Sequence, residues 1–425
     1  MESVLTSEQI ETESADAHGQ DRTVLTPGAE VFINKAAKAI LVAIGLAVLL
    51  ATWTAAGIGE NAGAEGARLG GDFPAFYAAG SIVWEGDIDS LYDPARQQAA
   101  QDELGLDGYL AFAYPPHVAV AYAPLGALSF QAAYLLHTIA MGLAFGLAVH
   151  LIAPMAPLLQ RWKWPLVAAS FTFLPLISAV GGGQNAAFSV LVLAVVWRSL
   201  HDGHDVVAGV AIGLLVFRPQ YAIPMIGLVL LARHWRTVAS ALGTIAATWV
   251  LTAAVRGTGW FSAWWEQVGP FIERDAEVNA ANSISFLGFL HAVLPAASWV
   301  AVFVGVVLSV GVVLTLMHLW SEPDRFSLAS RMGAAAIGLI LISPHTMFYD
   351  ASLLLIAGGA LLAESTSVPV RGLAALWLGA TAHVLSDSFG ATPLIFVVVV
   401  AFCLFVARAV SNSAPLGTSP REEFV

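Results

Sequence analysis

VLPAASWVAVFVGVVLSVGVVLTLMHL, residues 293–319, is the stretch of the sequence that decides the fold class. It contains no Asp, Glu, Lys or Arg. An α-helix needs about 20 predominantly apolar residues to cross the hydrocarbon core of a bilayer, so this stretch predicts a membrane-spanning helix.

Apolar segments of this kind recur along most of the chain. Of 425 residues, 58% are hydrophobic and 11% are charged, whereas a soluble domain carries about 25% charged residues. We therefore expect an all-α polytopic membrane protein, with residues 35–409 forming one integral membrane domain of about twelve transmembrane helices. The candidate helices span residues 35–56, 131–153, 164–181, 186–199, 205–217, 220–233, 237–255, 293–319, 330–343, 348–363, 370–386 and 391–409.

The two ends of the chain differ from this membrane domain. Residues 1–34 are polar and acidic, which indicates a disordered cytosolic tail, and residues 410–425 are expected to form a second cytosolic tail. The single cysteine, Cys403, lies inside the last apolar run, so the sequence excludes a disulfide framework or a thiolate metal cluster. The net charge of −12 argues against binding to nucleic acid.

The distribution of basic residues predicts the orientation in the membrane. With the N-terminus in the cytosol and one crossing per segment, most of the 18 Lys and Arg residues fall in cytosolic loops, as the positive-inside rule requires. The prediction is a multi-pass protein of the inner (plasma) membrane with both termini in the cytoplasm. It requires that residues 112–129 do not cross, and the prolines Pro115, Pro116 and Pro124 disfavour a straight spanning helix there. We expect a re-entrant or interfacial segment on the outer side.

Two long regions are then extracytoplasmic, residues 57–130 and residues 256–292. The first contains GGDFPAFYAAGSIVWEGD and LYDPARQQAAQDELG, and we expect both to form amphipathic helices along the membrane surface. The second contains GWFSAWWEQVGPFIERD, in which a tryptophan cluster accompanies acidic residues. Interfacial tryptophans commonly act only as membrane anchors.

Four polar clusters fall on this same outer face. They are Asp72 after the first predicted helix, Gln184 and Asn185 in GGGQN, Arg218 and Gln220 in FRPQY, and His345, Tyr349 and Asp350 in SPHTMFYD. Ionisable groups at membrane depth cost a few kcal/mol each, so they mark functional sites by default. Their convergence on one side predicts a common site.

Each of these residues also has an alternative structural explanation. Arg218 could hold phosphate oxygens in a bidentate fork or extend as a surface arginine. Asp72 could accept a proton from a sugar hydroxyl or cap the helix that starts at Phe73. His345 could hydrogen-bond a phosphate or be structural, and Asp350 could act as a second acid or open the following helix.

A metal site has little support in the sequence. His201, Asp202, His204 and Asp205 resemble a metal cluster, but they fall on the predicted cytosolic side, where we expect an exposed polar loop. The sequence contains no Gly-rich phosphate loop and no metalloprotease helix. We expect neither a metal nor another cofactor.

The order of the motifs resembles a known family. DFPAFYAAG, LYDP, FAYPP followed by APLGAL, GQN, a basic residue before Pro219, and SPH follow one another along residues 35–365. This series resembles the bacterial GT-C glycosyltransferases of the polyprenol-phosphate-mannose-dependent α-mannosyltransferase family, which includes the phosphatidylinositol mannoside mannosyltransferase type.

The resemblance implies a GT-C bundle with surface helices in the first outer loop and a catalytic acid, here Asp72, after the first span. It implies a sugar carried on a polyprenyl phosphate and no obligatory metal. Arg218, His345 and Gln220 would bind the donor phosphate. The remaining motif residues would contact substrate: Tyr77, Tyr114, His117, Gln184, Asn185, Tyr349 and Asp350. Two positions depart from the family pattern, since relatives commonly have lysine in place of Arg218 and many place Trp and His where HTMFYD follows Pro344.

The expected function is an inverting transfer of a hexose, mannose by this resemblance, to a glycolipid or glycan acceptor on the extracytoplasmic face. Three alternatives stay open: the same fold with a polyprenyl-phosphate pentose donor, a ligase that transfers a whole lipid-linked glycan, and a lipid or solute transporter. A transporter commonly places its polar groups near the bilayer midplane and is often built from internal repeats. The sequence shows no such repeat, and its polar clusters gather at one face.

Overall fold

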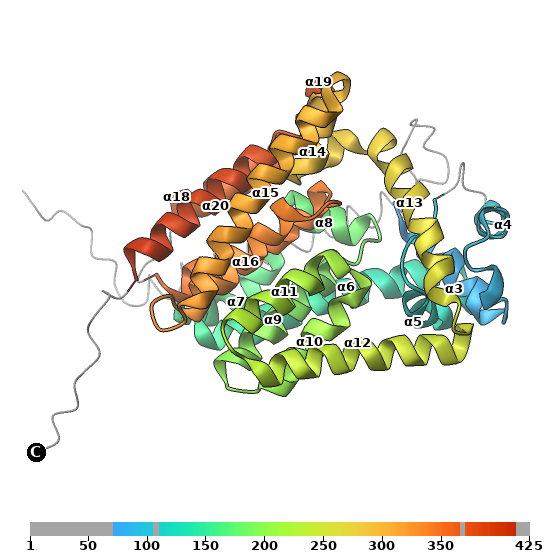
Figure 1. Cartoon of the computed structure of the whole chain (residues 1–425), viewed down its shortest axis with the longest axis horizontal. Helices are drawn as coiled ribbons and strands as arrows, with labels where there is room; N and C mark the ends of the chain where they lie inside the picture. The colour runs from blue at the N-terminus through green and yellow to red at the C-terminus, as the bar shows by residue number, and fades with distance from the viewer. Residues whose placement is uncertain (1–70, 105–109, 366–369, 414–425) are drawn as a thin grey trace, which may run out of the picture.

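The computed structural model describes residues 71–104, 110–365 and 370–413. This part of the chain is almost entirely helical (Figure 1), and its only β-pairing is an isolated antiparallel bridge between Ser283 and Met347. The all-α prediction is confirmed for these residues. The predicted tail at residues 1–34, the predicted first span at 35–56 and residues 414–425 of the C-terminal tail lie outside the described residues.

Among the described residues, four helices are long and apolar enough to cross a membrane. They are α6 (Phe130–Ile152), α12 (Trp235–Arg256), α15 (Ser298–Ser321) and α20 (Leu394–Ser411). A fifth candidate is a pair, α7 (Pro157–Ser170) and α8 (Leu174–Gly181), which bend by 62° at their junction. Proline near the start of α8, Pro175, suits a new helix that begins after a break.

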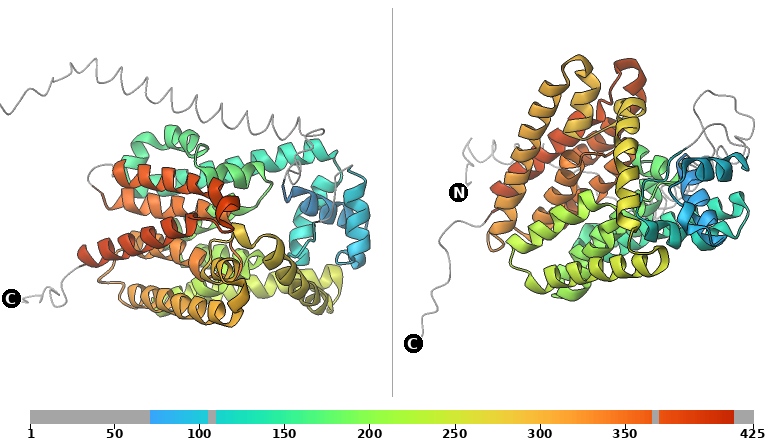
Figure 2. Two further views of the ribbon diagram at one scale, coloured as in Figure 1. Left: turned by 90° about the horizontal axis from the view of Figure 1, so that it is seen from above. Right: turned by 45° about the vertical axis from the view of Figure 1, so that its right-hand side comes forward.

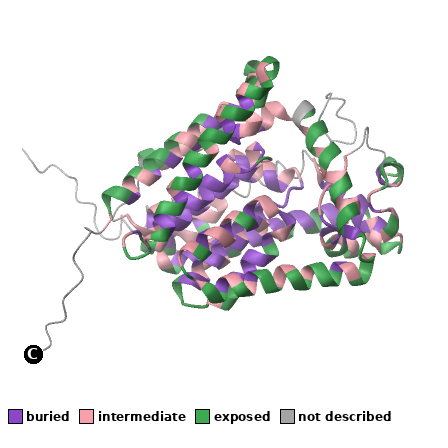
Figure 3. Cartoon of the chain, viewed as in Figure 1, coloured by how far each residue is buried: buried purple, intermediate pink, exposed green. Residues whose placement is uncertain are grey.

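The other predicted spans form shorter helices. They are α9 (Ala186–His201), α10 (Asp205–Leu214), α11 (Pro219–Leu231), α16 (Leu328–Ile342), α17 (Leu354–Ala363) and α18 (Val370–Thr381). The predicted number of about twelve full spans is therefore not confirmed by the described residues. Several of these short helices lie at the centre of the bundle (Figure 3), and every residue from 330 to 341 in α16 is buried.

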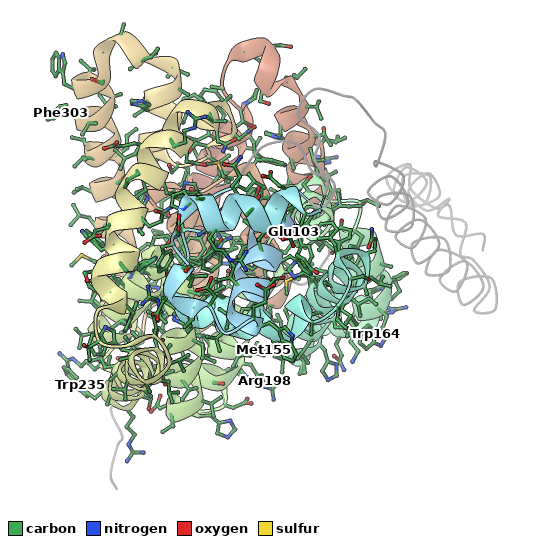
Figure 4. The ribbon with its side chains drawn as sticks, turned by 90° about the vertical axis from the view of Figure 1, so that its right-hand side faces the viewer. Glu103, Met155, Trp164, Arg198, Trp235 and Phe303 are labelled. Carbon is green, nitrogen blue, oxygen red and sulfur yellow. The ribbon has the colours of Figure 1, made fainter. Side chains whose placement is uncertain are left out.

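The long helices present apolar side chains outward. Leu251 on α12, Phe303 on α15 and Leu404 on α20 are 67%, 65% and 66% exposed. Figure 4 shows Phe303 and Trp164, which lies on α7, pointing away from the bundle. Large apolar surfaces of this kind are rare on soluble monomers and mark contact with lipid or a partner. Together with the composition, they indicate that the exterior of the bundle faces lipid.

The described residues of the first predicted outer region include three α-helices, grouped at one end of the molecule (Figure 2). They are α3 (Phe73–Trp84), α4 (Pro94–Asp102) and α5 (Pro116–Gly126). Because α5 has 11 residues, it is about 16 Å long, too short for a ~30 Å hydrocarbon core. The segment 112–129 therefore contains no straight spanning helix.

Helix α3 differs from the predicted surface helix, since eight of its 12 residues are buried. The reason is a close crossing with α5. A Cβ on Gly80 would lie 2.6 Å from the backbone oxygen of Tyr122, and a Cβ on Gly126 would lie 2.6 Å from Cα of Ser81. Glycine at both positions lets the two backbones touch, so α3 is packed on several sides instead of lying along a surface.

The second predicted outer region forms α13 (Trp260–Val278) and α14 (Phe286–Val293). Helix α13 follows the end of α12 and runs between the α3–α5 group and the helices α14 and α15 (Figure 1). This position makes α13 a wall of the space between them.

Candidate active site

A cavity of about 1020 Å³ lies where these parts meet. Its walls come from the start of α3, the segment 110–115, the junction of α10 and α11, the helices α13 and α15, and the loop after α16. Most of the residues predicted from sequence line it: Asp72, Tyr114, Arg218, Gln220, His345, Tyr349 and Asp350. The cavity is at the upper end of the sizes usual for small-molecule sites.

Asp72 is positioned by a crossing of two loops. Its backbone N–H donates to the carbonyl oxygen of Gly182 at 3.0 Å. Gly71 has a φ of +56°, and a Cβ there would lie 2.5 Å from the same oxygen, so only glycine fits. Although Asp72 occupies the N-cap position of α3, its side chain makes no capping hydrogen bond. It accepts a hydrogen bond from Nε2 of Gln184 instead.

Arg218 is buried in the break between α10 and α11. The helix restarts at Pro219, and Arg218 is only 4% exposed, which excludes the surface-arginine explanation. Nε and Nη2 donate to Oδ1 of Asn185 at 3.0 and 2.8 Å, and Nη1 pairs with Oδ1 of Asp350. Burial disfavours the charged form, but the carboxylate of Asp350 and the surrounding tyrosines together more than offset it and raise the pKa of Arg218 above its ordinary value.

Gln184 and Asn185 lie behind the cavity wall rather than in it. Each holds one charged group: Gln184 donates to Asp72, and Asn185 accepts from Arg218. Because consecutive Cα atoms are about 3.8 Å apart, the two adjacent amides bring the carboxylate and the guanidinium to one place. The GGGQN loop thus has a clear positional role.

The loop after α16 supplies the second half of the site. Asp350 pairs with Arg218 and also accepts from the backbone N–H of Met347 at 3.0 Å, so it both balances a charge and opens the next helical turn. His345 lies with Nδ1 3.0 Å from Oδ2 of Asp275 on α13. Asn279 donates to the other oxygen of Asp275 at 2.8 Å.

Two residues on α4 hold the cavity wall from behind, and the sequence analysis missed them. Gln101 donates to the carbonyl oxygen of Leu110 at 2.8 Å and accepts from its N–H at 3.0 Å, while Gln97 accepts from the N–H of Phe112 at 2.9 Å. Both glutamines are buried, and their i, i+4 spacing on α4 is the signal that could have identified them. They fix the extended segment that carries Tyr114, whose pKa is raised by burial.

Tyr77 and His117 are not among the lining residues. The hydroxyl of Tyr77 donates to the carbonyl oxygen of Leu128 at 2.6 Å, which links α3 to the end of α5. Both ring nitrogens of His117 are buried and, among the described residues, have no hydrogen-bond partner. Burial lowers the pKa of His117 to about 4.

The comparison with protein-family models identifies the chain. The model of glycosyltransferase family 87 matches residues 112–344, which is more than half of the 425 residues. The chain belongs to glycosyltransferase family 87. Since this family is of the GT-C type, the predicted resemblance is confirmed at that level, and the protein is a membrane glycosyltransferase. No curated protein and no solved structure matches the chain.

The match places the family 87 region relative to the site. It includes Tyr114, Arg218 and the whole of α13, and it ends at Pro344, one residue before His345. Asp72 lies before the matched region. The cavity of this family 87 member is therefore assembled from matched residues and from segments that flank them on both sides.

The aromatic wall of this family 87 protein comes from α13. Phe261, Trp264, Trp265 and Phe271 line the cavity, and Nε1 of Trp264 donates to the carbonyl oxygen of Ala113 at 2.9 Å. From the sequence, this tryptophan cluster was expected to be a membrane anchor. In the structure, only Trp260 of the three is buried away from the cavity, packed 5.8 Å from the ring of Trp249.

No metal centre is evident in the described part of this family 87 protein. No group of three or more His, Cys, Asp or Glu side chains there lies close enough to hold a metal ion. In the polar loop at 201–205, Asp202 pairs with Arg198 at 2.6 Å, and Asp205 lies 3.1 Å from His234.

Proposed function

We propose that this glycosyltransferase transfers a hexose, mannose, from a polyprenyl-phosphate donor to a hydroxyl of a glycolipid or glycan on the extracytoplasmic face of the inner membrane. The observation that carries the proposal is the placement of Asp72 and Arg218 at one cavity by the adjacent amides Gln184 and Asn185. A sugar transfer needs a base for the acceptor and stabilisation for the leaving phosphate, and these two side chains supply both.

Asp72 acts as the general base in this mechanism. Its carboxylate takes the proton of the acceptor hydroxyl as the oxygen attacks the anomeric carbon of the donor. The bond between that carbon and the phosphate oxygen breaks, and the electron pair leaves with the polyprenyl phosphate. Attack on the face opposite the phosphate inverts the anomeric configuration.

Arg218, His345 and Gln220 stabilise the departing phosphate, whose charge grows in the transition state. Three of the five guanidinium N–H groups of Arg218 are engaged by Asn185 and Asp350. Because Arg218 lines the cavity, we assign its remaining N–H groups to the phosphate oxygens. An imidazolium donates from both ring nitrogens, so in that form His345 bonds Asp275 through Nδ1 and the same phosphate through Nε2.

The apolar wall between α11 and α15 supports a lipid-linked donor. Ile223 and Pro224 from α11 and Val306, Val310 and Val313 from α15 line this part of the cavity. Several of the same side chains, including Ile223 and Val310, are exposed, and α15 is one of the helices long and apolar enough to cross a membrane. An isoprenoid tail can therefore lie against the wall and continue into lipid, which a nucleotide donor has no need to do.

A donor panel tests this function. The full-length protein in lipid nanodiscs is incubated with short-chain polyprenyl-phosphate mannose, the corresponding polyprenyl-phosphate pentose, and GDP-mannose, together with a mannoside acceptor. We expect consumption of the polyprenyl-phosphate mannose alone. Consumption of the pentose donor would establish the alternative enzyme, while consumption of GDP-mannose or of no donor would contradict the proposal.

A further inference from the structure

The face of α13 that lines the cavity follows a helical stripe. It comprises Phe261, Trp264, Trp265, Val268, Phe271, Ile272 and Asp275, and it continues to Asn279, the residue just after the helix. These positions recur at intervals of three and four residues, so they share one side of the helix. The opposite side carries exposed polar residues such as Glu266, Glu273 and Arg274. An amphipathic helix of this kind buries its apolar face, and here that face is turned to the cavity.

Two tryptophans give this face a defined ring surface. Trp264 is fixed by its hydrogen bond to Ala113, and its ring meets that of Trp265 edge to face, with centroids 6.3 Å apart. Trp265 is 62% exposed while lining the cavity, so one large ring is open to a ligand. Aromatic faces attract the C–H groups of a pyranose ring, whose own faces are apolar and whose rim is polar.

The polar end of the same wall favours a neutral ligand. Asp275 and Asn279 line the cavity, as does Asn282 just beyond the end of α13. None of the residues that α13 contributes to the lining is Lys or Arg, whereas Arg218 lies on another wall. An anionic group is therefore drawn toward Arg218, and amide side chains next to aromatic rings suit sugar hydroxyls.

The two apolar walls of the cavity, one from α11 and α15 and the other from α13, also differ in the kind of side chain they carry. The wall from α11 and α15 carries aliphatic side chains and no aromatic ring, which suits a flexible isoprenoid chain. The α13 wall carries rings, and about 16 Å separates Trp264 from Asp275 along the helix axis. This length exceeds that of one pyranose ring.

We propose that the cavity face of α13 binds a neutral pyranose ring of the acceptor, which stacks on Trp264 and Trp265 and hydrogen-bonds to Asn279 and Asn282. The proposal rests on the proposed function and specifies its acceptor: a glycan or glycolipid that presents an uncharged hexopyranose at the hydroxyl to be glycosylated. Trp265 is then a residue of the acceptor site and takes no part in proton transfer.

Steady-state kinetics of Trp265→Ala test the subsite. The probes are short-chain polyprenyl-phosphate mannose and n-octyl α-D-mannopyranoside below its micellar concentration, with full-length protein in nanodiscs. We expect the KM for octyl mannoside to rise about three- to tenfold, as lost aromatic contacts typically cost, while the donor KM stays within about twofold. Trp265→Tyr should recover most of the affinity. The matched control is Trp299→Ala, which removes a 77% exposed tryptophan of α15 that does not line the cavity.

A binding measurement distinguishes a failure of the proposed acceptor subsite from a failure of the proposed function. Octyl mannoside is titrated without donor, against an octyl ethylene-glycol ether that has the same tail and no sugar. If Trp265→Ala weakens mannoside binding but wild type transfers no sugar, the subsite stands and the proposed function fails. If the ether competes as well as the mannoside, if the acceptor KM is unchanged, or if the donor KM rises instead, the subsite is overturned.

Discussion

Asp72 and Arg218 are held by neighbouring amides, yet in opposite ways. Gln184 donates to Asp72 without neutralising its charge. Arg218 is paired with the carboxylate of Asp350 in addition to its contact with Asn185, and both members of this pair are buried. The difference teaches that the hydrogen bond from Gln184 orients a reactive carboxylate, whereas the ion pair with Asp350 offsets the free-energy cost of burying the charge of Arg218. Loss of Gln184 should therefore lower the rate of transfer, whereas loss of Asp350 should lower the stability of the fold.

The largest effect is expected for Asp72→Asn. The asparagine keeps the size of the side chain and can still accept from Gln184, so the fold should persist while the base is lost. We expect transfer to fall about 10²- to 10⁴-fold, measured as mannose transfer to octyl mannoside at saturating donor. The control is Asp102→Asn, an exposed carboxylate in the same group of helices. Full activity of Asp72→Asn would remove Asp72 from the mechanism.

Asp350→Ala should act on stability. It leaves the buried guanidinium of Arg218 without its countercharge, which typically costs about 3–5 kcal/mol. We expect a lower thermal unfolding midpoint in detergent and lower yield of folded protein.

The double variant Arg218→Met with Asp350→Leu sharpens the comparison. Removing both charges should restore part of the lost stability while transfer stays abolished. If the double variant unfolds at the same temperature as Asp350→Ala, charge pairing does not account for the effect.

Gln184→Ala should produce a smaller change, seen in rate. Hydrogen bonds to charged groups contribute about 1.5–3 kcal/mol, so a carboxylate that loses its orienting donor should act about ten- to a hundredfold more slowly. The control is Gln160→Ala on an exposed position of α7. If Gln184→Ala lost as much stability as Asp350→Ala while its folded fraction transferred sugar at the wild-type rate, Gln184 and Asp350 would not differ in role as proposed.

His117 extends the comparison to a buried group that has neither kind of support among the described residues. Its pKa is about 4 in the folded protein and about 6.5 when unfolded. The unfolded chain therefore takes up a proton first as pH falls, so this contribution to stability is intact above about pH 6.5 and declines toward pH 4. We expect a loss of about 2 kcal/mol by about pH 5.

Thermal unfolding at about pH 7.5 and about pH 5 checks this, because His117→Phe should lower the pH sensitivity of the midpoint. The exposed His201→Gln serves as the control. Equal pH sensitivity of wild type and His117→Phe would show that His117 does not titrate in this way.

Much of the fold could be predicted because a helix that crosses lipid needs about 20 predominantly apolar residues in a row. The apolar segments at 131–153, 237–255, 293–319 and 391–409 correspond to α6, α12, α15 and α20 within a few residues. The number of full spans could not be predicted, since a short apolar helix inside a bundle and one that crosses lipid have similar composition. Burial of α16 on all sides depends on neighbours far away in the chain.

The candidate site could be predicted only in part from the sequence, for the same reason. Asp72, Arg218 and His345 stand out as polar groups at breaks between apolar segments, and the structure brings all three to one cavity. Their partners are not recognisable locally: Asp275 lies 70 residues from His345 in sequence and within hydrogen-bonding distance of it in space. The role of Trp265 likewise depends on which side of α13 faces the cavity.

From the sequence alone followed a helical membrane protein with clustered polar groups and a resemblance to GT-C glycosyltransferases, because hydrophobicity and motif order are local properties of the chain. Only the tertiary structure decided which amide supports which charge, that Arg218 is balanced by Asp350, and that the rings of α13 face the cavity. Those facts depend on contacts between segments far apart in sequence, and the energies of such contacts arise only when the chain has packed.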